Sequence, residues 1–318
     1  MTPLVRPAPG VLEQVPLARY TSLRVGGLGR WFLASADASE LARLLDVAAA
    51  DGLPTLILGG GSNLLISDDG FDGAVLKYTA TGHRVEAGAA DTLVVRAAAG
   101  ASFSNLARRL ARDGVGTLEW AANVPGTVGG AVVNNAGAFG GCVADHLIEA
   151  EIVDRAGAVR TLAAEELAYA YRASVLKRGE LGPAIVTSAR LRARRADPAH
   201  AVALVQELQA KRTASQPRQL SAGSIFANPP GDYSGRLIEA AGLKGTRVGG
   251  AEISTHHANF IVNPGGATAR DVYSLIRAAQ IAVWERFGVW LRPEVQLVGR
   301  WSPDELAALA APAGAERP

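Results

Sequence analysis

Three polar residues stand beside apolar runs, and their side chains can bind anions or move protons. Arg172 lies in the run YRASVLK, Ser224 in SAGSIFANP and Glu294 in LRPEVQLVG. An arginine can bind a carboxylate through two parallel hydrogen bonds. A half-buried glutamate in a strand can polarise a substrate or shuttle a proton. The three residue types together suit a site for an anionic substrate.

Ser224 follows Gly223 in an expected loop. A serine is a poor acid in water, but in a closed site it can protonate a strongly basic carbanion or enolate. No G-x-S-x-G elbow surrounds it and no His/Asp partnership is evident, which disfavours an acyl-transfer nucleophile. Plainer interpretations stay open: a structural turn for Ser224, an ion pair for Arg172 and a solvent-facing carboxylate for Glu294.

The stretch LILGGGSN at residues 56–63 follows an apolar run and can hold a phosphate. Consecutive glycines let backbone N–H groups converge on an anion, and Ser62 and Asn63 add side-chain donors. The dinucleotide fingerprint G-x-G-x-x-G is absent. A tight turn between two strands explains these residues equally well.

A second stretch, residues 123–141, contains six glycines and three asparagines together with apolar residues that include Val128, Val132 and Phe139. Its apolar content predicts an irregular segment that packs inside the protein. Buried irregular backbone needs partners for its N–H and C=O groups, and a large polar ligand would supply them. Two glycine-rich cradles on different units favour one long cofactor, such as a flavin dinucleotide.

Hydrophobic periodicity predicts the elements that position these residues. We expect helices over residues 37–51, with a capping box between Asp37 and Glu40, over 102–114, from 198 and over 268–287. A hairpin is expected around residues 155–157, a polar linker over 211–223 and a final strand over 291–299, which carries Glu294. Residues 1–20 are expected to be irregular and the tail from residue 301 to fray. We place the units at 1–78, 79–195 and 196–300, followed by the tail 301–318.

Composition excludes several classes of protein. The chain has 318 residues, is 48% hydrophobic and carries a net charge of +2, which argues against nucleic acid or a membrane surface as a main partner. Its only cysteine, Cys142, cannot form an internal disulfide, so a reducing cytoplasm is the simplest location. Neither a signal peptide nor a membrane span is expected. The adjacent His256 and His257 lack metal-site spacing, and no metal is expected.

Eight motifs in order resemble those of the UDP-N-acetylenolpyruvoylglucosamine reductases, also called UDP-N-acetylmuramate dehydrogenases, over residues 20–299. The motifs are YTSLRVGG, LILGGGSNLL, VPGTVGGAVVNNAGAFG, YRASVLK, SAGSIFANP, AGLKGTRVGGAEIS, HANFIVN and LRPEVQLVG. The spacing around YRAS and HANFIVN is similar to that of the second, shorter type of this enzyme.

The resemblance implies an α+β protein with a vanillyl-alcohol-oxidase-type FAD-binding fold in two subdomains and a C-terminal α+β substrate-binding domain. It also implies an oxidoreductase of cell-wall precursor synthesis that reduces UDP-N-acetylglucosamine enolpyruvate to UDP-N-acetylmuramate. NADPH would reduce non-covalently bound FAD at N5. The hydride would then pass to C3 of the substrate, and C2 would be protonated. A monomer is expected, with the UDP-sugar as small-molecule partner.

The resemblance also implies residue roles. Ser224 corresponds to the proton donor, and Arg172 and Glu294 to the pair that binds and polarises the enolpyruvyl carboxylate. The expected substrate contacts are Tyr171, Asn228, Lys244 and His257. The expected FAD contacts are Leu58, Gly59, Gly60, Gly61, Ser62, Asn63, Pro125, Gly126, Thr127, Gly129, Gly130 and Asn135.

Two positions depart from the family pattern. Ala227 and His256 stand where lysines are usual, and Arg218 or Lys244 would have to compensate at the substrate phosphates. Two other functions stay open. One is another flavin oxidoreductase of the same fold, many of which bind flavin covalently through a histidine; His146 lies just beyond the second glycine stretch. The other is a non-catalytic nucleotide-sugar-binding protein, which would not need Ser224, Arg172 and Glu294 together.

Overall fold

The computed structural model describes residues 9–89 and 91–312. The chain forms two compact units that are not continuous in sequence. Unit 1 comprises Met1–Glu13, Trp31–Gly60 and Gly73–Arg212. Unit 2 comprises Gln14–Arg30, Gly61–Asp72 and Thr213–Pro318. Contacts between distant segments, and not order along the chain, therefore define each unit.

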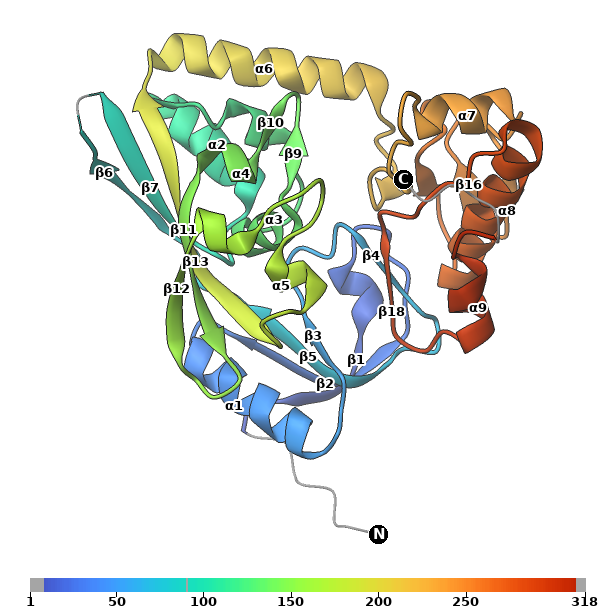
Figure 1. The fold of residues 1–318 in the computed structure, drawn as a ribbon, viewed down its shortest axis with the longest axis horizontal. Coiled ribbons are helices and arrows are strands. Elements are labelled where there is room, and N and C mark those ends of the chain that lie inside the picture. Colours follow the sequence, from blue (N-terminus) through green and yellow to red (C-terminus); the bar gives the residue numbers. More distant parts are fainter. Residues whose placement is uncertain (1–8, 90, 313–318) are drawn as a thin grey trace. The chain divides into compact units, whose positions relative to one another are not determined.

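A six-stranded antiparallel sheet forms the centre of unit 1 (Figure 1). Its strand order is β12 (Val159–Ala163), β11 (Leu147–Asp154), β13 (Ala184–Arg195), β7 (Thr92–Ala98) and β6 (His83–Ala87), and β8 (Val115–Gly116) also pairs with β13. The expected hairpin around residues 155–157 is confirmed, since β11 and β12 pair from Val153 and Val159. Arg190 on β13 forms ion pairs with Glu149 and Glu86.

Helix α1 (Ala38–Ala50) of unit 1 begins and ends where local signals predict. The Asp37 carboxylate accepts a hydrogen bond from the Ser39 N–H at 2.8 Å, and Gly52 adopts φ 65° after the last turn. The expected capping box is wrong, because the Glu40 carboxylate instead accepts from the Ser35 hydroxyl at 2.6 Å. Four apolar side chains of α1 join a core with Trp31 and Leu33: Leu41, Leu44, Leu45 and Ala48.

Two expectations about unit 1 are wrong. Residues 123–141 are not irregular throughout, because α3 (Val128–Asn134) forms inside them, capped by Thr127. The polar run after residue 211 is not a linker from its start, because α6 (Pro198–Ser215) continues to Ser215. Packing of apolar residues overrides the low helix propensity of glycine in α3. Other elements of unit 1 are α2 (Phe103–Arg112), α4 (Val143–His146), α5 (Val175–Arg178), β9 (Gly137–Ala138), β10 (Gly141–Cys142), η2 (Glu119–Asn123) and η3 (Ala164–Leu167), besides strands described below.

The first glycine-rich stretch is not a turn between two paired strands. Its preceding strand, β3 (Thr55–Ile57), pairs in parallel with β5 (Phe71–Tyr78). Its following strand, β4 (Leu64–Ile66), pairs in parallel with β18 (Gln296–Val298). The alternative of a tight strand-to-strand turn is therefore wrong, and residues 58–63 connect two separate pairings.

The described part of unit 2 contains a four-stranded antiparallel sheet and the α-helices α7 (Ser234–Ala240), α8 (Ala269–Phe287) and α9 (Pro303–Ala308) (Figure 1). The strand order is β14 (Leu220–Ser221), β17 (Ile261–Asn263), β16 (Ala251–Ile253) and β15 (Arg247–Val248). The expected start of α8 is confirmed by a capping box between Thr268 and Asp271. Leu23, Val25 and Leu65 join the apolar core of this unit, although they lie far from it in sequence.

Three expectations near the chain ends are corrected. Residues 12–20 are not irregular, because they form β1 (Leu12–Pro16) and η1 (Leu17–Tyr20), which precede β2 (Leu28–Ser35); residues 1–8 lie outside the described part of the chain. The tail contains α9, which begins at a Ser302 capping box. The last strand is shorter than expected, and Glu294 lies before it. Local caps thus extend regular structure into segments whose composition suggests fraying.

Candidate active site

The two glycine-rich stretches touch each other within unit 1. A β-carbon added at Gly60 would lie 2.5 Å from the Gly126 Cα, and one added at Gly59 would lie 2.8 Å from the Thr127 Oγ1. Such distances are too short for a side chain, so only glycine permits this approach. The predicted cradles therefore form one continuous surface of main chain, at least over residues 59–60 and 126–130.

Thr127 and Gly129 hold the second stretch in place. The Thr127 hydroxyl caps α3 by accepting a hydrogen bond from the Gly130 N–H at 3.3 Å. A β-carbon at Gly129 would lie 2.9 Å from the Ala99 Cβ, so this glycine lets α3 lie against the chain after β7. Gly129 is buried, whereas Gly126, Thr127 and Gly130 are half-buried and Pro125 is exposed. Part of the stretch is thus accessible to a ligand.

Buried polar atoms without hydrogen-bond partners occur within this stretch and just before it. Among the described residues they include the Trp120 Nε1, both amide atoms of Asn123 and the Asn134 Oδ1. Asn123 is 5% exposed. Buried polar groups almost always have a partner, because an unpaired group costs free energy. These atoms therefore mark a place where a bound molecule can complete the hydrogen bonding.

Arg172 is fixed to the end of the same stretch. Its Nη2 donates to the Gly137 carbonyl at 3.0 Å, and its Nη1 donates to the Asn135 carbonyl at 3.4 Å. The Arg172 backbone has a φ of 52°, which a non-glycine residue adopts only where its surroundings impose it. The exposed Tyr171 ring lies 5.3 Å from the guanidinium carbon. Backbone strain at this position suits a functional role for Arg172.

The Asn135 side chain bonds to protein main chain. Its Nδ2 donates to the Ala170 carbonyl at 3.1 Å, and its Oδ1 accepts from the Ala144 N–H at 2.9 Å. Asn135 is buried and ends α3 with a φ of 43°. This predicted cofactor contact therefore also connects the chain after α3 to the segment that precedes Arg172.

Unit 2 brings Ser224, Glu294 and Asn63 together. The Glu294 N–H donates to the Ile225 carbonyl at 2.7 Å, so the segment after Ser224 lies against the segment that carries Glu294. The Asn63 Nδ2 donates to the Glu294 carbonyl at 3.1 Å. Both Ser224 and Glu294 are half-buried. Within the described part of the chain, the Ser224 hydroxyl has no hydrogen-bond partner, which leaves it able to donate to a substrate.

Asn259, to which the sequence assigned no role, anchors the segment that follows Ser224. Its Oδ1 accepts from the Phe226 N–H at 2.9 Å, and its Nδ2 donates to the Phe226 carbonyl at 2.8 Å. Its own carbonyl accepts from the Ile225 N–H at 2.8 Å. Asn259 is only 4% exposed, so these bonds fix the chain directly after Ser224. The available signal was an asparagine in the otherwise apolar run HANFIVN.

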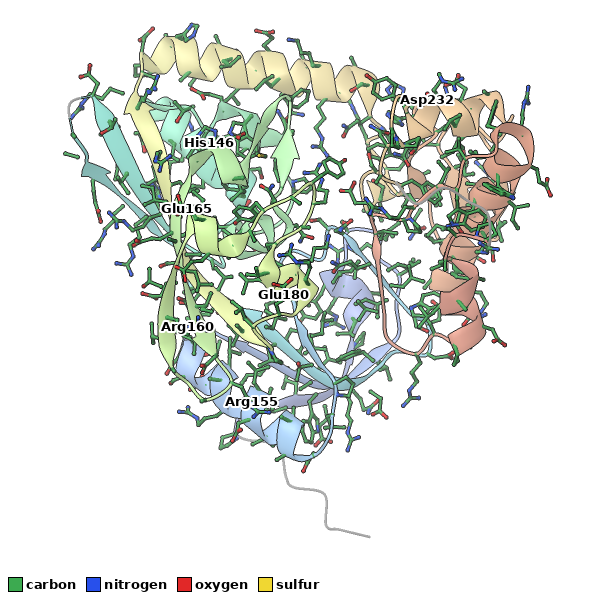
Figure 2. The ribbon with its side chains drawn as sticks, in the orientation of Figure 1. His146, Arg155, Arg160, Glu165, Glu180 and Asp232 are labelled. Atoms are coloured by element: carbon green, nitrogen blue, oxygen red, sulfur yellow. The ribbon has the colours of Figure 1, made fainter. Side chains whose placement is uncertain are left out.

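The three predicted substrate contacts of unit 2 lie around α7. The Asn228 Oδ1 accepts from the Ser234 N–H at 3.1 Å, and a β-carbon at Gly235 would lie 2.9 Å from the His257 Cε1. Lys244, beyond the end of α7, forms an ion pair with Glu239 at 2.7 Å. Figure 2 shows Asp232 in the loop that leads into this helix.

The surroundings of His257 favour its neutral form. Burial lowers the pKa of His257, and the neighbouring positive charge of Lys244 lowers it further. The His257 Nδ1 accepts from the Asn259 N–H at 3.2 Å. Since an amide N–H can only donate, the neutral ring carries its proton on Nε2. His257 can therefore donate one hydrogen bond to a substrate oxygen.

The two departures from the family pattern have different surroundings. Ala227 is buried, and its carbonyl accepts from the Ser234 hydroxyl at 2.6 Å. His256 is exposed, and its Nε2 lies 2.9 Å from the Ala214 carbonyl oxygen. Arg218 is exposed. Compensation by Arg218 or Lys244 at the substrate phosphates stays a prediction.

His146, which lies just beyond the second glycine-rich stretch, packs against an aromatic ring. The half-buried His146 ring stacks on Trp120 with a centroid distance of 5.8 Å, and burial lowers its pKa. Figure 2 labels His146 on α4.

No group of three His, Cys, Asp or Glu residues within 9–89 and 91–312 is arranged to hold a metal ion. In the same residues, no helix is both long and apolar enough to span a membrane.

Comparison with known proteins decides the family. Residues 31–163 match the FAD binding domain, and residues 216–298 match the C-terminal domain of UDP-N-acetylenolpyruvoylglucosamine reductase. UDP-N-acetylenolpyruvoylglucosamine reductase 2 of Symbiobacterium thermophilum is 45% identical over 299 residues, which cover 93% of this chain and 95% of the relative. The Chloroflexus aurantiacus reductase is 44% identical over 288 residues, 89% of this chain and 96% of the relative. The chain belongs to the UDP-N-acetylenolpyruvoylglucosamine reductase family.

A solved member of this reductase family has the same fold. The crystal structure of the Thermus caldophilus reductase is similar with a TM-score of 0.74 at 36% identity, and the match covers 89% of this chain and 97% of that one. Together with the FAD-binding domain match, it confirms the predicted α+β, vanillyl-alcohol-oxidase-type fold. As a member of the reductase family the chain is an FAD-dependent oxidoreductase.

The residues present fit an FAD group. Where residues 59–60 meet residues 126–130, the main chains approach so closely that a β-carbon at Gly60 would collide with the Gly126 Cα. Asn123 and Asn134, which carry buried polar atoms without partners, lie close in sequence to residues 126–130, and a flavin dinucleotide carries many donors and acceptors. The individual contacts predicted for FAD in this reductase stay predictions.

Proposed function

We propose that this chain reduces UDP-N-acetylglucosamine enolpyruvate to UDP-N-acetylmuramate during synthesis of peptidoglycan precursors, with FAD as cofactor and NADPH as reductant. The relatives reported above are named for this reductase activity. The match of residues 216–298 to the reductase's C-terminal domain supports the same substrate. A cytoplasmic location and a monomeric state belong to the proposal as predictions.

The observation that carries the proposal is the arrangement of Ser224 and Glu294 in unit 2. The backbone bond from Glu294 to Ile225 holds the two segments together, and Asn63 links the end of the first glycine stretch to Glu294. Asn259 fixes the chain after Ser224. A serine hydroxyl with no hydrogen-bond partner among residues 9–89 and 91–312, on a segment bonded to the one that carries Glu294, suits delivery of one proton at a defined position.

Bound FAD would carry a hydride from NADPH to C3 of the enolpyruvyl group. In the proposed mechanism Ser224 donates its hydroxyl proton to C2, where negative charge develops. Arg172 binds the enolpyruvyl carboxylate by a charge-assisted pair of hydrogen bonds, and Glu294 helps to polarise it. Tyr171, Asn228, Lys244 and His257 position the nucleotide sugar. Proton delivery by Ser224 is needed only after hydride transfer.

Replacement of Ser224 by alanine separates the two half-reactions. We expect Ser224→Ala to leave flavin reduction by NADPH within about twofold of wild type, and to slow reoxidation by the enolpyruvyl sugar by about 100-fold or more, because only the second step needs the proton. Stopped-flow absorbance measures both rates. Ser221→Ala, three positions earlier in the same segment, is the matched control and should change neither. Equal loss in both half-reactions would remove Ser224 from the acid role.

The colour of the purified protein tests the function as a whole. We expect a yellow protein that NADPH bleaches and the enolpyruvyl sugar restores under anaerobic conditions. A yellow protein restored only by a different acceptor would indicate another flavin oxidoreductase. A colourless protein that binds the sugar would indicate a non-catalytic binding protein.

A further inference from the structure

Lys77 lies at the base of the first glycine-rich stretch, and the proposed reaction assigns it no role. It stands near the end of β5, which pairs in parallel with β3 so that Ile57 is opposite Leu76. The carboxyl ends of both strands therefore lie at one edge of the pair. The Lys77 Nζ donates to the Gly59 carbonyl at 2.6 Å. The ammonium group is thus bound to the first residue of the loop 59–63.

The charge of Lys77 is poorly compensated within the described protein. Lys77 is half-buried, and its burial lowers the pKa of the amine. No carboxylate of the described residues forms an ion pair with it. An ammonium has three N–H donors, and the Gly59 carbonyl is its one protein acceptor here. Partial burial of a charge is costly unless a partner of opposite charge is present.

The surroundings of Lys77 suit a phosphate. Gly59 and Gly60 lie against Gly126 and Thr127, so the main chains of the two stretches meet at the loop whose Gly59 carbonyl binds the lysine. Backbone N–H groups bind phosphate oxygens but carry no net charge, and a nearby cation strengthens such a site. A dinucleotide brings two negatively charged phosphates.

We propose that Lys77 is a cofactor-binding residue, whose ammonium supplies the positive charge that balances the pyrophosphate of the flavin dinucleotide at the loop of residues 59–63. This inference rests on FAD being the cofactor, as in the proposed function. It assigns Lys77 a second task besides its bond to the Gly59 carbonyl.

Two flavin ligands and two substitutions at Lys77 separate the effect of its charge from that of its hydrogen bond to the Gly59 carbonyl. Lys77→Gln keeps a donor for the Gly59 carbonyl but removes the charge, and Lys77→Arg keeps both. FAD and riboflavin share the flavin ring, but only FAD carries the pyrophosphate. Flavin fluorescence quenching during titration of each apoprotein gives both dissociation constants. Lys211→Gln, which removes an exposed lysine of unit 1 that pairs with Glu207, is the matched control.

We expect Lys77→Gln to weaken FAD binding by about 10- to 100-fold, the range for one hydrogen bond to a charged group, and to leave riboflavin binding within about twofold of wild type. Lys77→Arg should bind FAD within about fivefold of wild type, and Lys211→Gln within about twofold. Raising the KCl concentration should weaken FAD binding to wild type more steeply than to Lys77→Gln. This salt comparison requires that both proteins are folded, which an unchanged far-UV circular dichroism spectrum would show.

An equal loss of FAD and riboflavin affinity in Lys77→Gln would show that the lysine only shapes the loop, and would overturn the inference. Unchanged FAD affinity in this variant would overturn it as well. If Lys77→Gln does not fold, unchanged FAD affinity of the wild type across KCl concentrations would count against the charge. A wild-type apoprotein that binds no FAD would contradict the proposed function itself, which is a separate outcome.

Discussion

His257 illustrates how surroundings decide the protonation state of one side chain. Burial, Lys244 and His256 all lower the pKa of His257, and the Asn259 N–H occupies its Nδ1. In the unfolded chain the imidazole titrates near its ordinary value of 6.5. Between the folded and unfolded pKa values, the unfolded state therefore binds more protons. Linkage then requires that His257 reduces stability as the pH falls through 6.5 and below.

Replacement of His257 by glutamine tests this sign. We expect wild type to lose more thermal stability than His257→Gln when the pH is lowered from about 8 to about 5.5, because only wild type must bury a proton-accepting imidazole. Scanning calorimetry at both pH values measures the difference. At the higher pH both side chains are neutral, so that condition is the internal reference. A parallel decrease in both proteins would show that His257 is not linked to folding.

At the scale of elements, the contact between the two glycine stretches predicts which of their glycines tolerates replacement by alanine. A methyl group at Gly60 would meet backbone at 2.5 Å, whereas a methyl group at Gly130 would meet only the Thr127 hydroxyl at 3.5 Å. Backbone cannot move aside as a flexible side chain can. Gly130 also lies inside α3, where alanine is the better helix former.

We therefore expect Gly60→Ala to destabilise the apoprotein by about 1–3 kcal/mol, as overpacking does, and to weaken FAD binding. Gly130→Ala should cost less than about 0.5 kcal/mol, because helix propensity offsets the mild contact. Urea denaturation of both variants measures the free energy of unfolding. Equal stabilities would mean that the two stretches do not pack as described.

At the scale of the whole molecule, unit 2 depends on chain segments far from its C-terminal portion. The Asp68 carboxylate accepts from the N–H groups of Ala269 and Arg270, at the start of α8, at 2.8 and 2.9 Å. β4 pairs with β18, and Leu23, Val25 and Leu65 contribute to the apolar core. Removal of these segments would leave apolar side chains exposed and backbone groups unpaired.

We expect a fragment of residues 213–318 to lack a cooperative thermal transition, since it loses the core contacts, the β4 partner and the Asp68 cap together. Circular dichroism at the helix wavelength, followed with temperature, tests this against the full chain. A sharp melting curve for the fragment would show that the C-terminal portion folds without residues 14–30 and 61–72.

Local signals in the sequence were enough to predict much of the secondary structure. The helix starts at Asp37, Ser102 and Thr268 follow from side chains that cap their own helix, and the hairpin at 155–157 follows from a short polar turn. Caps and turns act over a few residues, so their effect is readable from neighbouring positions. The order of eight motifs predicted the family, and with it the fold, that the comparisons confirm.

The tertiary structure alone decided which segments meet. Taken by themselves, Gly59–Asn63 was equally a strand-to-strand turn and Ser224 equally a structural residue. Gly60 contacts Gly126 within unit 1, and within unit 2 Asn63 bonds to Glu294 across 231 positions. Asn259 and Lys77 acquire roles only through partners from other segments. The reason is physical: a hydrogen bond or a packed contact between distant segments depends on how whole elements fit together, and no local pattern of residues encodes that distance.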